Sequence, residues 1–187
     1  MERYLIYLKN GAYRPKDARS LLLRARELVS DKSIIIRDTR VSKSFIEYDT
    51  SVPKNKKVEE VTSNLLSIAP LLDYESIAES KLEKEEAIKS AISFFNTEKY
   101  WRAHEVLEPI WKSSYGNEKA LLNGLILVAA AFVHHEKNEN DICVSILKRA
   151  IMKLERANGY YFGIRVDKIK DLVSGIIKTG NIERFIM

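Results

Sequence analysis

Cysteine and glutamine are scarce in this chain. The first scarcity excludes certain bonds and metal sites, and the second bears on the source of the protein. Cys143 is the one cysteine, so the 187 residues can form no internal disulfide and no zinc site of the multi-cysteine kind. A cytoplasmic location is the corresponding expectation. Glutamine is absent, and a shortage of thermolabile amides favours a thermophilic source, although ten asparagines weaken that inference.

Long apolar runs are also missing. No run reaches the roughly 18 residues that cross a membrane. The longest, residues 121–133, is interrupted by Asn123 and Gly124, which predicts a buried helix. The first ten residues, MERYLIYLKN, lack the charged, apolar and small-residue regions of a signal peptide. We therefore expect no membrane partner.

The charge is moderately basic, with a formal net charge of +5 and a pI of about 9.1. The excess of lysine and arginine is divided between both halves of the chain. A nucleic-acid interface needs a concentrated basic patch, so this distribution predicts an ordinary solvated surface.

Residues 1–77 show the order β-α-β-β-α-β, read from apolar alternation and helical spacing. We predict strands at residues 3–9, 34–36, 45–49 and 72–75, and helices at residues 15–29 and 58–68. This order is typical of the ferredoxin-like unit, in which two helices cover one face of a four-stranded antiparallel sheet. Its first and third strands are central and adjacent.

Residues 78–187 show only helical patterns, so the fold class is α+β with a C-terminal helical bundle. We predict helices at residues 80–96, 98–114, 118–137, 140–157 and 166–178. Ser80 and Glu83 fit a capping box, and Asn117 and Asn140 suit N-caps.

Residues 94–135 carry a distinctive series of features: Phe95-Asn96, Tyr100-Trp101, the run AHEVLE at 103–108, Trp111, and the helix LNGLI at 122–126. This series resembles the family catalogued as domain of unknown function 309, over residues of about 90–158. The resemblance implies a helical fold and no established activity. In similar proteins we expect a longer amide where Asn123 stands and a second amide where Leu127 stands.

The polar and aromatic residues of this segment that could form a site lie on one face of a predicted helix. Trp101, His104, Glu108 and Trp111 are spaced i, i+3, i+7 and i+10, with Glu105 beside them. With Asn123 they form the candidate polar cluster. Such a cluster is open to three interpretations: a buried structural network, a pocket for a small molecule or anion, and a metal or proton-transfer site.

The structural version predicts that His104 and Glu108 are largely buried, joined to each other, and close to Asn123–Gly124. The metal version finds less support, because an antiparallel register places His134 on the order of 9 Å beyond His104. HExxH zinc chemistry is absent, since position 108 is Glu. Because no third ligand of the usual type is predicted to converge on His104, we expect neither a metal nor another cofactor. We assign no catalytic residue.

The sheet face without helices offers a second candidate surface. Residues 6–10 and 44–48 resemble strand motifs of RNA-recognition domains, and alternation places Tyr7, Lys9 and Phe45 on that face. An open aromatic face favours either RNA or burial against another surface. We expect burial in a domain or subunit interface.

Three functions thus remain in order of preference. The first is a non-catalytic binding or protein-interaction module centred on the helical domain, with a homodimer or protein partner. The second is an RNA-binding protein that uses Tyr7, Lys9 and Phe45. The third is an enzyme or metal site at His104, Glu105 and Glu108.

Overall fold

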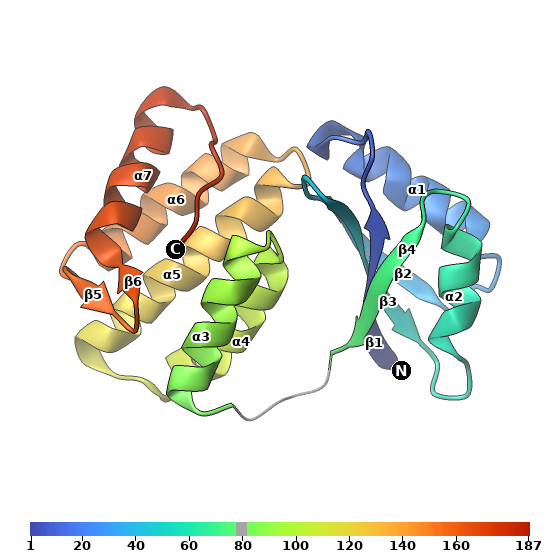
Figure 1. Ribbon diagram of the computed structural model, residues 1–187, viewed down its shortest axis with the longest axis horizontal. Helices are drawn as coiled ribbons and strands as arrows, with labels where there is room; N and C mark the ends of the chain where they lie inside the picture. Colours follow the sequence, from blue (N-terminus) through green and yellow to red (C-terminus); the bar gives the residue numbers. More distant parts are fainter. Residues whose placement is uncertain (78–81) are drawn as a thin grey trace. The chain divides into compact units, whose positions relative to one another are not determined.

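The computed structural model describes residues 1–77 and 82–187 and has the predicted α+β class (Figure 1). By its internal contacts the chain divides into two compact units. Unit 1 comprises Met1–Ser80 together with Glu136–Asn138, and unit 2 comprises Lys81–His135 with Glu139–Met187.

Unit 1 is built on a four-stranded sheet. Its strands are β1 (Glu2–Lys9), β2 (Ile35–Val41), β3 (Phe45–Val52) and β4 (Leu71–Ser76). They lie in the order β2-β3-β1-β4, and all neighbours are antiparallel. The prediction that the first and third strands are central and adjacent is therefore confirmed.

Two helices lie on one side of this sheet (Figure 1): α1 (Ala18–Leu28), which follows a short turn at Pro15–Asp17, and α2 (Val58–Leu65). The alternating residues of β1 and β3 that point toward them, such as Ile6 and Tyr48, form one apolar core with the helices. The other sheet face carries Leu5, Tyr7 and Phe45, because side chains alternate along a strand.

Unit 2 contains five helices within its described residues: α3 (Lys84–Asn96), α4 (Tyr100–Ser113), α5 (Gly116–His135), α6 (Asn140–Leu154) and α7 (Val166–Thr179). α5 is the core helix and packs against both α4 and α6. Its side chains are apolar around most of the helix, as burial on several sides requires. In the described part of the chain, α5 is the helix long and apolar enough to cross a membrane, a criterion that core helices of soluble proteins also meet.

Helix starts differ from the predicted caps. The predicted capping box begins on Ser80, which lies outside the described residues, and α3 starts at Lys84 after Glu83. Asn117 lies inside α5, which begins at Gly116, so its prediction as an N-cap is wrong. Asn140 is the first residue of α6 and not its cap, because its side-chain oxygen is in contact with the ring of His135.

A short hairpin between α6 and α7 was not predicted. It consists of β5 (Tyr160–Tyr161) and β6 (Ile164–Arg165). The two turn residues between the strands, Phe162 and Gly163, both have positive φ, at 47° and 91°. This combination is the signature of a type I′ turn, whose twist matches that of paired strands.

Candidate functional site

The candidate polar cluster is carried by α4. The buried side of this helix is formed by Tyr100, Ala103, Val106, Leu107 and Ile110, which recur at helical spacing. The His104, Glu105 and Glu108 side chains occupy positions next to this stripe. Residues three or four apart are neighbours on a helix surface, so Glu108 lies beside both of the other two.

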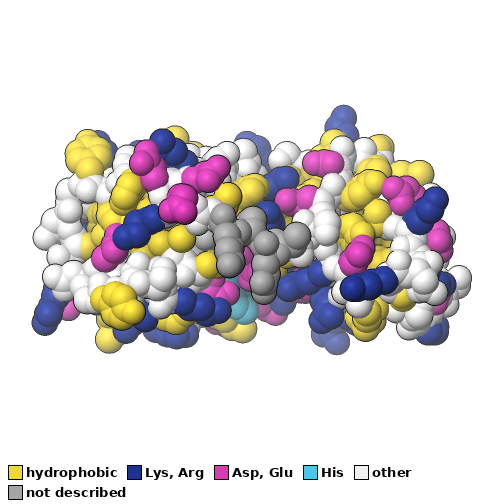
Figure 2. Space-filling model, turned by 90° about the horizontal axis from the view of Figure 1, so that it is seen from below, with side chains coloured by type: hydrophobic (Ala, Val, Ile, Leu, Met, Phe, Trp, Pro, Cys, Tyr) yellow, Lys and Arg dark blue, Asp and Glu magenta, His cyan; other side chains and the backbone are white. Residues whose placement is uncertain are grey.

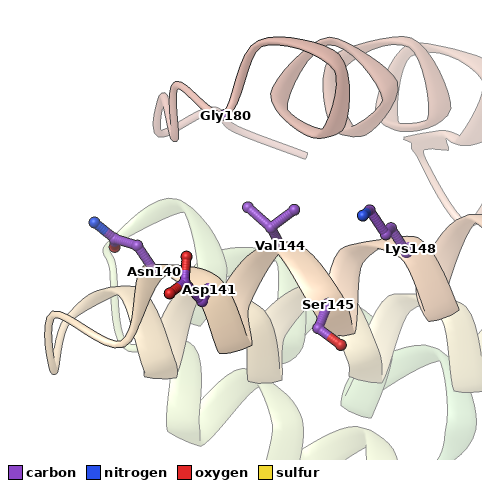
Figure 3. Close-up of a pocket in the computed structure, with 6 residues that line it drawn as sticks. All are labelled: Asn140, Asp141, Val144, Ser145, Lys148 and Gly180. Carbon is purple, nitrogen blue, oxygen red and sulfur yellow. The ribbon is translucent and has the colours of Figure 1, made fainter.

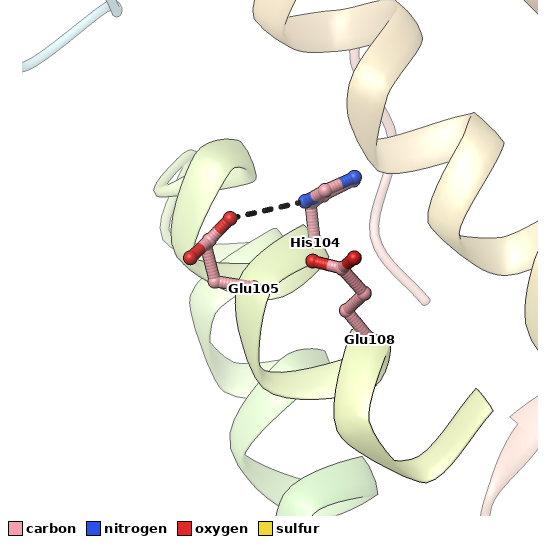
Figure 4. Close-up of side chains that lie close together, drawn as sticks. All are labelled: His104, Glu105 and Glu108. Atoms are coloured by element: carbon pink, nitrogen blue, oxygen red, sulfur yellow. Dashed lines mark ion pairs between the residues drawn. The ribbon is translucent and has the colours of Figure 1, made fainter. Parts of the chain in front are cut away.

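These three side chains converge. One ligand atom from each of His104, Glu105 and Glu108 lies within 4.8 Å of the other two. The Nδ1 atom of His104 is 3.6 Å from Oε1 of Glu105, and both carboxylates lie on the same side of α4 as the imidazole (Figure 4). We refer to these three residues as the His/Glu group.

The His/Glu group is partly exposed. The side chains of His104, Glu105 and Glu108 keep 30%, 29% and 34% of their accessible surface. The expectation that His104 and Glu108 are largely buried is therefore wrong. The core side of α4 is filled by the apolar stripe, and the two residues stand at its margin.

Gly124 also differs from its expected place. We expected it to let α5 approach α4 near Glu108. A Cβ built on Gly124 would instead meet the Leu154 side chain at 2.5 Å and the Ala150 carbonyl oxygen at 3.4 Å, both on α6. The glycine therefore accommodates α6. Among the described residues, no hydrogen bond joins Asn123 to the His/Glu group.

Lys112 balances part of the negative charge. Its Nζ lies 2.9 Å from Oε1 of Glu108, one helical turn away. This hydrogen bond lowers the pKa of Glu108, and the nearby His104 adds to the effect, while partial burial opposes it. Glu108 is therefore ionised at neutral pH. Glu105 has no comparable basic neighbour among the described residues, where its ion-pair partner is His104.

His104 carries an unsatisfied atom. Its Nδ1 is shielded from solvent and has no hydrogen-bond partner within the described residues. The separation of 3.6 Å from Glu105 is too long for a hydrogen bond. A shielded ring nitrogen next to two carboxylates can accept a cation, or a proton shared with a carboxylate.

The other members of the predicted cluster lie apart from this convergence. Trp111 packs on the edge of the helical core, and the Lys119 ammonium lies 5.4 Å from its ring centroid. Trp101 and Asn123 are half-buried. His134 contacts Glu139 at 2.5 Å. His134 therefore has a carboxylate partner of its own, outside the His/Glu group.

The premise behind the expected absence of metal is wrong. We predicted that three ligands would not converge, because His134, the third ligand considered, lies too far from His104 along the helices. Glu105 completes the group from the same turn of α4. The sequence run HEVLE contained this signal, since Glu108 is four residues from His104 and three from Glu105, and both spacings make neighbours on a helix surface.

The second predicted surface lies in unit 1. Tyr7 and Phe45 stack edge to face, with ring centroids 5.2 Å apart, and both are buried, whereas Lys9 is exposed. The Tyr7 hydroxyl donates a hydrogen bond of 2.6 Å to Glu75. These contacts occupy the rings and the hydroxyl that would otherwise stack on and bind a base.

The same sheet face holds a charged network that the sequence did not reveal. Arg40 pairs with Glu47, and its Nη2 lies 3.4 Å from Asp49. Arg3 binds both carboxylate oxygens of Asp49, at 2.6 and 2.9 Å. Arg40, Glu47 and Asp49 are buried. Because the two carboxylates pair with the two arginines, this network offers no excess positive charge to nucleic-acid phosphates. In the view of Figure 2, acidic and basic side chains are interspersed, without a broad basic patch.

Comparisons with known proteins bear on unit 2. The family model described as Domain of unknown function (DUF309) matches residues 88–146, which confirms the predicted resemblance. An uncharacterised protein of Aquifex aeolicus (strain VF5) is 26% identical over 98 residues, which are 52% of this chain and 29% of that protein. The chain thus spans less than a third of the length of that relative.

A solved structure is similar to about half of the chain. The crystal structure of the conserved hypothetical protein TTHA0068 from Thermus thermophilus matches with 25% identity and a TM-score of 0.43. The match covers 49% of this chain and 95% of that one. Residues 88–146, which match the DUF309 family model, include α4, α5 and the whole His/Glu group.

Proposed function

We propose that the helical unit is a binding module for a divalent transition-metal cation, held by His104, Glu105 and Glu108. The observation that carries this proposal is the convergence of one nitrogen and two oxygen ligands within 4.8 Å on one side of α4. The partnerless Nδ1 of His104 supports it, because a shielded acceptor without a hydrogen bond is costly, by about 1–3 kcal/mol, and a cation would satisfy it.

The ligand set favours a particular class of cation. Imidazole suits zinc, iron, copper and nickel, whereas carboxylates also suit manganese, magnesium and calcium. One imidazole with two carboxylates therefore favours Zn²⁺ or Mn²⁺ over Ca²⁺ or Mg²⁺, which take oxygen ligands. Three protein ligands leave coordination positions for water or for a group supplied by a partner.

Binding requires a small adjustment of the side chains. Two atoms that are each about 2.1 Å from one ion lie no more than about 4.2 Å apart. The His104 Nδ1–Glu105 Oε1 separation of 3.6 Å already meets this limit, and any pair separated by as much as 4.8 Å would have to draw together by several tenths of an ångström. Rotation of the partly exposed glutamates supplies this movement without repacking the core stripe of α4.

Lys112 competes with the cation in this proposal. Its ammonium already occupies one oxygen of Glu108. A bound cation must either displace it or use the other carboxylate oxygen. Removing the lysine charge therefore raises metal affinity, whereas removing a ligand lowers it. These opposite directions distinguish a specific site from general attraction between cations and carboxylates.

The test is isothermal titration of the chelator-treated full chain with ZnCl₂ and, separately, MnCl₂. We expect one equivalent to bind, with at least about tenfold weaker affinity in H104A and in E108Q. K112Q should bind more tightly than the unmodified chain. E105Q should resemble the other ligand variants.

The matched control is H134A. His134 also lies beside a carboxylate, Glu139, but outside the His/Glu group. Its loss should leave the affinity unchanged. Equal binding by H104A, E105Q, E108Q and the unmodified chain would contradict the proposal, as would a complete lack of binding.

A further inference from the structure

The segment after α7 folds back onto the helical core. We call residues 181–187 the return segment. Its Phe185 ring lies 5.4 Å from the ring centroids of both Phe95, at the end of α3, and Phe132, on α5. Those two core rings are fully buried. Phe185 therefore serves as an anchor in an aromatic cluster.

Polar contacts fix the register of the return segment. The Asn96 side chain contacts the backbone of Met187 twice: Oδ1 accepts from the Met187 N–H at 2.8 Å, and Nδ2 donates to its carbonyl at 3.4 Å. Arg184 donates to Glu98 at 2.7 Å. An aromatic anchor, a two-point backbone contact and a charge pair together give a sequence preference to the surface beneath the return segment, which we call the groove.

The return segment begins after the C-cap of α7, where the Gly180 N–H donates to the Ile176 carbonyl at 2.8 Å, and its residue Ile182 packs against the helical core. Gly180 has a left-handed φ of +72°, and no atom lies within 4 Å of the position of a Cβ. A hollow of about 350 Å³ separates Gly180 from Asn140, Val144 and other residues of α6 (Figure 3). The backbone N–H of Asn181 bonds only locally, to Thr179. Gly180 can thus act as a hinge without disturbing the core.

We propose that the groove formed by Phe95, Asn96, Glu98 and Phe132 is a peptide-binding site, and that the return segment of a second copy can occupy it in exchange. Every copy carries both the groove and the segment that fits it. An exchanged dimer keeps each contact that the monomer makes, so only the hinge must change. The groove thereby becomes a self-association surface of this chain.

A charge exchange between copies tests this arrangement. In full-length E98R the groove repels its own Arg184, and in full-length R184E the segment repels its own Glu98. When the two variants are mixed, an exchanged heterodimer restores both charge pairs at once. The double variant E98R/R184E restores the pair within one chain and is the matched control.

We expect the mixture to form dimers in sedimentation and light-scattering measurements, with an association constant at least about tenfold above that of either variant alone. The double variant should remain at the level of the unmodified chain. A mixture that behaves as the sum of its two components would overturn the proposal.

A second measurement covers the case in which these variants fold poorly. A labelled synthetic peptide of residues 180–187 is titrated against full-length F185A and against the unmodified chain. Because the internal segment competes for the groove, F185A should bind at least about tenfold more tightly. A peptide with alanine at the Phe185 position is the control. Equal binding of both peptides to F185A would also overturn the proposal.

Discussion

The two units each contain a cluster of acidic and basic side chains, and the clusters differ in how far they are buried. In unit 1, Arg40 and Glu47 each expose 2% of their side-chain surface, and Asp49 exposes 3%. In unit 2, the side chains of the His/Glu group keep about a third of their accessible surface.

This difference in exposure distinguishes charges that stabilise the fold from charges that a ligand can reach. Buried charges must be paired where they lie, because water cannot solvate them. The Arg40 network meets that demand through Glu47, Asp49 and Arg3. The His/Glu group has an excess of carboxylate charge that solvent or a cation can satisfy. We therefore propose that the first cluster stabilises the fold and that the second is available for binding.

The largest effect should follow from breaking the buried network. Replacing Arg40 by methionine leaves Glu47 without its charge partner inside the protein. Removing one member of a buried pair lowers the free energy of unfolding by about 3–5 kcal/mol. Urea unfolding of R40M, followed by circular dichroism, measures this loss.

Two controls sharpen that result. K89M removes an exposed pair with Glu85 and should change the free energy of unfolding by less than about 1 kcal/mol. R40M/E47M removes both buried charges while Asp49 keeps Arg3, so it should be more stable than R40M. If R40M were no less stable than K89M, the contrast between the two clusters would fail.

An intermediate effect is expected in the apolar core of unit 2. In G124A the new methyl group would lie 2.5 Å from the Leu154 side chain, which is fully buried. Such overpacking lowers the free energy of unfolding by about 1–3 kcal/mol. Thermal and urea unfolding measure the loss.

Gly175 provides the matched glycine. It lies inside α7, and nothing lies within 4 Å of the place of its Cβ. G175A should therefore raise the free energy of unfolding, by about 0.5–1 kcal/mol, because alanine favours helix over glycine. Equal changes in both variants would show that helix propensity decides the outcome instead of the contact with α6.

Much of unit 1 follows from its sequence. Alternation in residues 3–9 and 45–49 predicted β1 and β3, and the order of elements predicted their central positions. The pairing of Arg40 with Glu47 could not be predicted from the sequence. The register between β2 and β3 shifts between Ile36 and Asp38, and such an irregularity leaves no signal in the alternation.

In unit 2 the helices followed from periodicity, whereas the burial of single residues did not. His104 and Glu108 share a helix face, but the sequence does not show whether this face packs against the core, because that depends on how the neighbouring helices pack. The contact of Gly124 with α6 is likewise a property of packing. The hairpin around Phe162 and Gly163 is too short for alternation to reveal.

The smallest effect should come from Glu108, and it tests the assignment of unit 2 directly. In the absence of metal, E108Q removes one partly exposed ion pair with Lys112. The free energy of unfolding should fall by less than about 1 kcal/mol at neutral pH. A buried structural network would instead give a loss comparable to that of R40M.

The pH dependence provides the check on this last prediction. The hydrogen bond from Lys112 lowers the pKa of Glu108 in the folded chain. The unfolded chain therefore binds the proton more readily, and the contribution of Glu108 is present above its ordinary pKa of about 4.3. It is lost as the pH falls through the lowered pKa. The unmodified chain and E108Q should thus differ slightly at neutral pH and converge in acid. A difference that grew as the pH fell would have the wrong sign for a carboxylate stabilised by Lys112.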